Sequence, residues 1–104
     1  MAEGFQDCEE ALLEYSKEFC DTSGACASIA IVRGDLVCCG NVGDCQVGLI
    51  DEDGEIEMLT HPHRISSLDE LERVKAAKGK GWHGMVENGR IMGIIEPSRT
   101  FGDR

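Results

Sequence analysis

Short apolar segments separated by tight turn sequences fill the middle of the chain, and they limit its fold more than any other feature. Four segments read as strands, at residues 25–32, 36–40, 46–50 and 55–59. The connections between them consist of turn formers: Arg33-Gly34-Asp35, Asn41-Val42-Gly43-Asp44 and Asp51-Glu52-Asp53-Gly54. Because connections this short cannot carry a parallel crossover, the sequence predicts an antiparallel meander.

Two helices are predicted on either side of these strands. The first covers residues 7–20, begins at Asp7 as N-cap, and has one apolar stripe: Cys8, Leu12, Tyr15 and Phe19. The second covers residues 68–78, where Ser67 and Glu70 form a capping box and the buried face consists of Leu68, Leu71 and Val74. Gly79 is its predicted stop, and a hairpin around Asn88-Gly89 follows at residues 85–91. These elements place the chain in the α+β class.

The charge of the chain excludes some partners. Its 104 residues contain 20 Asp and Glu against 10 Lys and Arg, a net charge of −10, so neither nucleic acid nor an anionic membrane is expected as the main partner. The 41% of hydrophobic residues is typical of a globular domain.

The cysteines, the short apolar runs and the acidic N-terminus indicate a cellular compartment. The longest apolar run, residues 25–32, is far too short to cross a membrane, and the acidic N-terminus does not resemble a signal peptide. Without a secretory signal, the six cysteines are interpreted as reduced thiols. We therefore expect a cytoplasmic or nuclear protein.

Two kinds of metal site fit the residue pattern. Zinc could be held by a subset of Cys38, Cys39, Cys45, His61, His63 and His83, although no Cys-x-x-Cys pair is present to anchor it. The other candidate uses Asp44 and Asp103, each of which follows a glycine at the end of a strand. Carboxylates presented from such bends suit hard cations such as Mg²⁺ or Mn²⁺.

A collinear series of motifs runs from Ser23 to Asp103. It reads Ser23-Gly24-Ala25-Cys26-Ala27, Gly40-Asn41-Val42-Gly43-Asp44-Cys45-Gln46, Leu59-Thr60-His61-Pro62-His63, Glu70-Leu71-Glu72-Arg73-Val74, Lys78-Gly79-Lys80-Gly81, Arg90-Ile91-Met92-Gly93 and Ser98-Arg99-Thr100-Phe101-Gly102-Asp103. In order and spacing this series resembles the metal-dependent protein phosphatases, the PPM or type 2C serine/threonine phosphatases.

The resemblance implies a fold, a reaction and one site residue. The family fold is an α-β-β-α sandwich, in which two antiparallel sheets are flanked by helices. Its two-metal centre, with Mg²⁺ or Mn²⁺, activates a water that attacks phosphoserine or phosphothreonine in a phosphoprotein substrate. The aspartate of the family's Gly-Asp-Ser-Arg motif lies near this centre and contributes to an additional metal site, and that position is Asp44. No residue is assigned a catalytic or cofactor-binding role.

The departures from the family series lead to a narrower expectation. The family's Asp-Gly-His-Gly-Gly, Asp-Gly-x-Trp-Asp and Asp-Asn segments, which supply most metal ligands, have no counterpart in residues 1–104. We therefore expect residues 1–104 to be a partial PPM domain that is inactive in isolation and self-associates through exposed sheet edges. The alternative is a non-catalytic, pseudophosphatase-like interaction protein, since Cys45, Gln46 and Pro62 replace the usual Ser, Arg and Asp.

Overall fold

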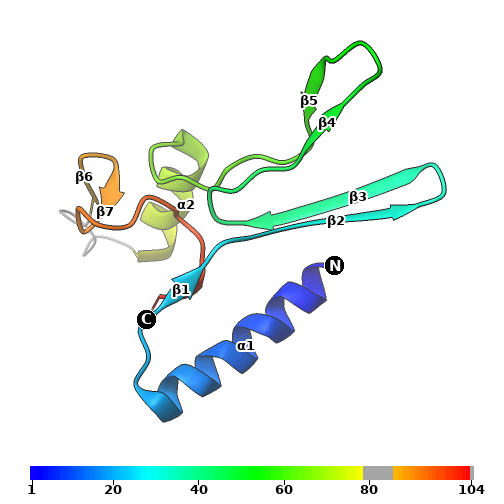
Figure 1. Ribbon diagram of the computed structural model, residues 1–104. Helices are drawn as coiled ribbons and strands as arrows, with labels where there is room; N and C mark the ends of the chain where they lie inside the picture. Colours follow the sequence, from blue (N-terminus) through cyan, green and yellow to red (C-terminus); the bar gives the residue numbers. More distant parts are fainter. Residues whose placement is uncertain (79–85, 104) are drawn as a thin grey trace.

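Each strand pairs with a neighbour in sequence, except that the first strand pairs with the last. The computed structural model describes residues 1–78 and 86–103, and this part contains two helices and four two-stranded antiparallel sheets (Figure 1). The elements are α1 (Ala2–Phe19), β1 (Gly24–Ala25), β2 (Ala27–Arg33), β3 (Leu36–Val42), β4 (Gly48–Ile50), β5 (Ile56–Met58), α2 (Leu68–Lys78), β6 (Val86–Glu87), β7 (Arg90–Ile91) and β8 (Phe101–Gly102). The prediction of an α+β class is confirmed.

Three of the sheets are hairpins whose turns the sequence predicts. The β2–β3 hairpin pairs Ala27 with Val42 and closes at Arg33 and Leu36, where Gly34 takes a φ of +58°. The β6–β7 hairpin turns through Asn88 and Gly89, which both have positive φ as an Asn-Gly turn requires. The β4–β5 hairpin turns at Asp51, whose side-chain Oδ1 accepts the backbone N–H groups of Asp53 and Glu55. Figure 1 shows the β2–β3 and β4–β5 hairpins projecting from the region around α2; we call these two hairpins the arms.

The predicted meander is wrong at one connection, because β3 and β4 belong to different sheets in the described part of the chain. The side chain of Asn41 explains this break. Its amide Nδ2 donates to the backbone carbonyls of Gly43 and Cys45, each at 3.2 Å, and to that of His61 at 3.0 Å. These bonds hold residues 43–45 and the backbone at residue 61 around the Asn41 amide, so the chain forms a wider loop after β3 in place of the predicted tight turn.

Helix α1 differs from the prediction in its start and in its buried face. It begins at Ala2 with Met1 as N-cap, so the predicted N-cap at Asp7 is wrong. The least exposed positions are Phe5, Glu9, Leu13 and Ser16, one residue, or about 100° of helix, away from the predicted stripe. Tyr15 and Phe19 of that stripe are 54% and 59% exposed.

Contacts with β8 decide which face of α1 is covered. The ring of Phe5 stacks on that of Phe101 with centroids 5.7 Å apart. Glu9 Oε2 accepts the backbone N–H of Gly102 at 3.0 Å. Neither partner lies near α1 in sequence, so the apolar periodicity of the helix alone could not identify this face.

Few side chains of the described residues are fully buried. Ile65, at 1% exposed, and Phe101 form the apolar core, and the polar residues Ser16, Thr60 and Glu70 are buried with them. The radius of gyration is 16.0 Å, larger than the roughly 13 Å of a compact chain of about 100 residues. Apart from Ser16 in α1, these buried residues lie in residues 60–70 and 98–102. Together with the turn at residues 41–45, which bonds to the first of these segments, we call them the loop cluster.

Helix α2 is confirmed over its predicted range, but two of its details differ. Leu68 is 67% exposed rather than buried, while Leu71 and Val74 are half-buried. Glu70 does not reach back to Ser67 as a capping box requires, because its carboxylate accepts from Arg73, Ser98 and Arg99. The predicted stop at Gly79 lies outside the described residues. Neither helix within the described ranges has the length and apolar character needed to span a membrane.

Candidate functional site

The turn after β3 is the best-defined part of the loop cluster. Gly43 is buried and has a φ of +97°. A Cβ at this position would overlap the Cys26 side chain and lie 3.3 Å from the carbonyl oxygen of Arg99. Only glycine combines this conformation with this close approach, so the turn brings Asp44 to a defined place.

His63 closes the turn from the other side. Its Nδ1 accepts the backbone N–H of Gly43 at 3.2 Å, and its own backbone N–H donates to the Gly43 carbonyl at 2.8 Å. An Nδ1 that accepts a hydrogen bond belongs to a neutral imidazole with its proton on Nε2. Burial lowers the pKa of His63, and the positive charge of Arg99 lowers it further, which favours this neutral form.

Asp44 has one neighbour on each side-chain oxygen. Cys26 Sγ donates to Oδ1 at 3.7 Å, and Arg64 Nε lies 3.9 Å from Oδ2. Burial raises the pKa of the Cys26 thiol, and the charge of Asp44 adds to this effect, so the thiol remains a donor. Arg64 Nε also lies 3.7 Å from Glu96 and, among the described residues, has no hydrogen-bond acceptor.

A buried carboxylate, Glu70, anchors the same region from α2. Its Oε1 accepts from Arg99 Nη2 at 2.6 Å, and its Oε2 accepts from Arg99 Nε at 3.1 Å, a two-point contact. Ser98 Oγ and Arg73 Nη2 donate to Oε2 at 2.5 and 2.9 Å. Burial opposes ionisation of Glu70, but these hydrogen bonds outweigh it and hold the pKa of the carboxyl well below its usual range. The bond to Glu70 in turn raises the pKa of Arg99.

Sequence reasoning did not identify this anchor. Glu70, Arg73, Ser98 and Arg99 all lie in the motifs that carry the family resemblance, but Glu70 was interpreted as part of a helix cap. One acidic residue and two basic residues lie in motifs of the same series, and this pattern could have indicated an ion-pair cluster. Nothing in the spacing indicates that Glu70 and Arg99, 29 residues apart, would meet.

Of the other predicted site residues, Cys45 and His63 lie in or against the turn of Asp44, and Asp103, Cys38 and Cys39 have their contacts elsewhere. The carboxylate of Asp103 lies against Gly24, and its backbone N–H donates to the Ser23 carbonyl at 3.1 Å. Cys38 and Cys39 sit in β3 opposite Ile31 and Ala30 of the arm. His83, one of the zinc candidates, lies outside the described residues. Within residues 1–78 and 86–103, no three His, Cys, Asp or Glu side chains come together as a metal site would need.

The described residues therefore do not fit a complete metal centre. A divalent cation such as Mg²⁺ requires about six oxygen ligands, whereas Asp44 is a single carboxylate whose oxygens face a thiol and a guanidinium. What the turn offers is one carboxylate in a fixed position, 32% exposed, beside a cationic side chain.

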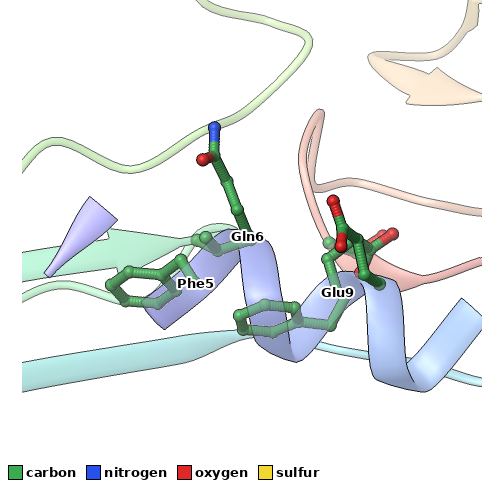
Figure 2. A pocket seen from close by; sticks show the side chains of 7 residues that line it. Phe5, Gln6 and Glu9 are labelled. Atoms are coloured by element: carbon green, nitrogen blue, oxygen red, sulfur yellow. The ribbon is translucent and has the colours of Figure 1, made fainter. Parts of the chain in front are cut away.

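A pocket of about 480 Å³ opens between α1 and the ends of β3 and β8, close to this turn. Figure 2 shows Phe5, Gln6 and Glu9 arranged along α1 at its wall. Glu9 is held by the backbone N–H of Gly102, so its carboxylate is part of the contact between α1 and β8. The pocket is a groove at a packing interface rather than a second cluster of reactive groups.

Several known proteins are similar to this chain in sequence. The family described as protein phosphatase 2C matches residues 1–104, which extends the similarity beyond Ser23 to include α1. Protein phosphatase 2C 57 of Arabidopsis thaliana is 40% identical over 85 residues, 80% of this chain and 21% of its own length. Probable protein phosphatase 2C 69 of the same plant is 30% identical over 105 residues, the whole of this chain and 28% of its own length. Protein phosphatase 1L of Bos taurus is 34% identical over 83 residues, 80% of this chain and 22% of its own length.

The chain thus spans roughly a fifth to a quarter of the length of these relatives. No solved structure matches it. The match of one family over all 104 residues nevertheless shows the relationship. The chain belongs to the protein phosphatase 2C family.

Proposed function

We propose that residues 1–104 form part of a PPM-type phosphatase domain that removes phosphate from phosphoserine and phosphothreonine in protein substrates. The observation that carries this proposal is the turn at Asp44, where Asn41 and His63 bind the backbone of Gly43. Such a turn presents a carboxylate rigidly, as a cation-binding site needs.

We further propose that Mg²⁺ or Mn²⁺ serves this domain and that Asp44 is the ligand contributed by this chain. Divalent cations in such a site supply an acidified water as nucleophile. Because no three potential ligand side chains come together among the described residues, we expect the remaining ligands from other parts of a complete domain. Residues 1–104 alone are therefore expected to have no phosphatase activity.

A chimera tests this proposal. The segment of this chain that matches protein phosphatase 2C 57, at 40% identity over 85 residues, would replace its counterpart in that protein. Hydrolysis of a phosphothreonine peptide would be followed at increasing Mn²⁺. We expect the chimera to retain activity within about tenfold of its parent. Asp44→Asn in the chimera should raise the Mn²⁺ concentration needed for half-maximal rate at least about fivefold, because one charge-bearing ligand is lost.

Asp53→Asn is the matched control, since Asp53 lies in the exposed turn of the β4–β5 arm. It should leave the Mn²⁺ dependence unchanged. A folded chimera without activity would refute the phosphatase proposal, and equal effects of the two substitutions would refute the assignment of Asp44. In a parallel assay, Mn²⁺-dependent turnover by residues 1–104 alone would contradict the expectation that they are inactive.

The second candidate is a non-catalytic, pseudophosphatase-like interaction protein. It is favoured by Cys45 and Gln46, which replace the Ser-Arg of the family motif directly after Asp44. The thiol of Cys45 donates to the Val42 carbonyl at 3.4 Å, so it supports the turn rather than facing a substrate. An inactive but folded chimera is the result that this candidate predicts.

We also propose that the isolated chain self-associates through its arms. Ile31, Val32 and Leu36 of the β2–β3 arm are 51%, 70% and 74% exposed, and within the described ranges this hairpin pairs with no third strand. Open edges beside apolar side chains favour pairing with a second copy. The cytoplasm or nucleus is the proposed location, because all six cysteines are free thiols and a reducing compartment keeps them so.

A further inference from the structure

We infer that Glu70 is a positioning residue for the turn that presents Asp44. This inference rests on the proposed function, because it matters for chemistry only if Asp44 belongs to the active site. Glu70 itself makes no contact with Asp44; it acts through a chain of contacts that starts on α2 and ends at Gly43.

The first link joins α2 to the segment before β8. Glu70, 7% exposed, binds Arg99 with both carboxylate oxygens and accepts the hydroxyl of Ser98. Arg73, one helical turn further along α2, donates to Glu70 and also to the Ser98 carbonyl at 3.0 Å. Residues 98 and 99 are thus held by side-chain and backbone contacts to one helix.

The second link joins this segment to the turn. The backbone N–H of Ser98 donates to the His63 carbonyl at 2.9 Å, and the Arg99 carbonyl packs against Gly43. His63 and Gly43 exchange two hydrogen bonds, at 2.8 and 3.2 Å. A shift of residues 98 and 99 would therefore move both His63 and Gly43, and Asp44 follows directly in the chain.

The chemistry of this anchor requires a carboxylate of this length. A carboxylate can accept from the two-pronged Arg99 guanidinium and from Ser98 and Arg73 together, because both of its oxygens are acceptors and share the negative charge. An amide can accept only through its single oxygen, and its NH₂ group would face a guanidinium. Glu70→Gln thus keeps the volume of the side chain and removes the two-point contact.

Amide hydrogen exchange of residues 1–104, measured by NMR in Glu70→Gln and in the unsubstituted chain, tests the inference. Glu72→Gln is the matched control, because Glu72 is exposed on the same helix. We expect the exchange rates of the Gly43, His63 and Ser98 amides to rise at least about tenfold in Glu70→Gln. This rise should be at least about five times the rise for amides of the β2–β3 hairpin. The ¹⁵N signals of the His63 imidazole should also shift away from the form with an unprotonated, bonded Nδ1. Glu72→Gln should change neither readout.

If the exchange rates of the turn and of the hairpin rise by similar factors, or not at all, the inference is overturned. Glu70 would then stabilise the whole chain or have no role. If Glu70→Gln unfolds the whole chain, Arg99→Lys is judged by the same ratio, since lysine keeps the charge and loses the fork. Failure of that variant too to accelerate the turn selectively overturns the inference. The measurement uses neither metal nor substrate, so an inactive chimera would reject the proposed function and leave this result standing.

Discussion

The loop cluster and the arms are ordered by opposite means. In the loop cluster, polar side chains bond to partners 20 to 29 residues away, as between Gly43 and His63 or Glu70 and Arg99. In the arms, each strand pairs with the strand next to it in sequence, and apolar side chains such as Val32 and Ile50 remain 70% and 67% exposed. Among the described residues, the arms therefore combine exposed apolar side chains with strand pairing that stays within each hairpin.

An apolar segment of the sequence is thus not always a buried segment of the structure. The strands of the arms have the composition of core strands, yet the described residues do not cover them. The loop cluster has a mixed composition, yet it contains Ile65, which is 1% exposed. Substitutions of matched residues in the two regions should therefore have unequal effects on stability.

The largest expected effect compares two isoleucines. Ile65→Ala should lower the free energy of unfolding by about 3 kcal/mol, because it removes buried methylenes and leaves a cavity. Ile31→Ala in the β2–β3 arm, where the side chain is 51% exposed, should cost about 1 kcal/mol or less. Urea denaturation followed by circular dichroism measures both, and equal costs would mean that the arms are as well packed as the loop cluster.

The next effect compares two glycines with positive φ. Gly43→Ala should destabilise the chain by about 2 kcal/mol, since the added methyl meets Cys26 and the backbone is strained. Gly34→Ala, in the β2–β3 turn, meets no atom within 4 Å and carries only the strain of its φ of +58°, about 1 kcal/mol. If Gly34→Ala proves the more harmful change, the crowding at Gly43 does not contribute to stability.

A smaller effect is expected from pH through His63. Its pKa in the folded state is lowered by burial and by Arg99, so the unfolded chain binds protons first as the pH falls. Stability linked to His63 is therefore complete above the ordinary histidine pKa of about 6.5 and declines as the pH falls below it. Urea denaturation at pH 7.5 and pH 5.5 should show a larger loss for the unsubstituted chain than for His63→Asn.

His61→Asn serves as the control, because the side chain of His61 is exposed. It should keep the full pH dependence of the unsubstituted chain.

The pairing of Glu70 with Arg99 acts in the same direction at lower pH, since a depressed carboxyl pKa means that stability falls as that carboxylate is protonated. A pH dependence that His63→Asn leaves unchanged would assign the effect to other groups.

The smallest effect on stability is expected in the arms. Val32→Lys should change the free energy of unfolding by no more than about 0.5 kcal/mol, since Val32 is 70% exposed. The same substitution should weaken self-association, because a charged residue beside an open strand edge opposes pairing. Light scattering after size-exclusion chromatography measures the change, with Asp53→Lys in the other arm's turn as a control for added charge. An unchanged oligomer would remove the β2–β3 arm as the contact.

The sequence alone determined the elements that depend on neighbouring residues. The β2–β3 register follows from Gly34 and its short turn, the β6–β7 hairpin follows from Asn88-Gly89, and α2 follows from a local apolar period. The order of motifs also determined the family. For the two hairpins and α2, the residues that carry the information lie close together in the sequence, so local spacing is enough to predict them; the family depends instead on the order of motifs from Ser23 to Asp103.

Tertiary structure decided the remainder. The face of α1 depends on Phe101 and Gly102, the break between β3 and β4 depends on Asn41 reaching the His61 carbonyl, and the support of Asp44 depends on Glu70 meeting Arg99. Each of these contacts joins residues about 20 or more positions apart, and several polar side chains compete for the same partners. Which partner a carboxylate or amide selects is decided by burial, since a polar group without a hydrogen bond is costly only where water is excluded.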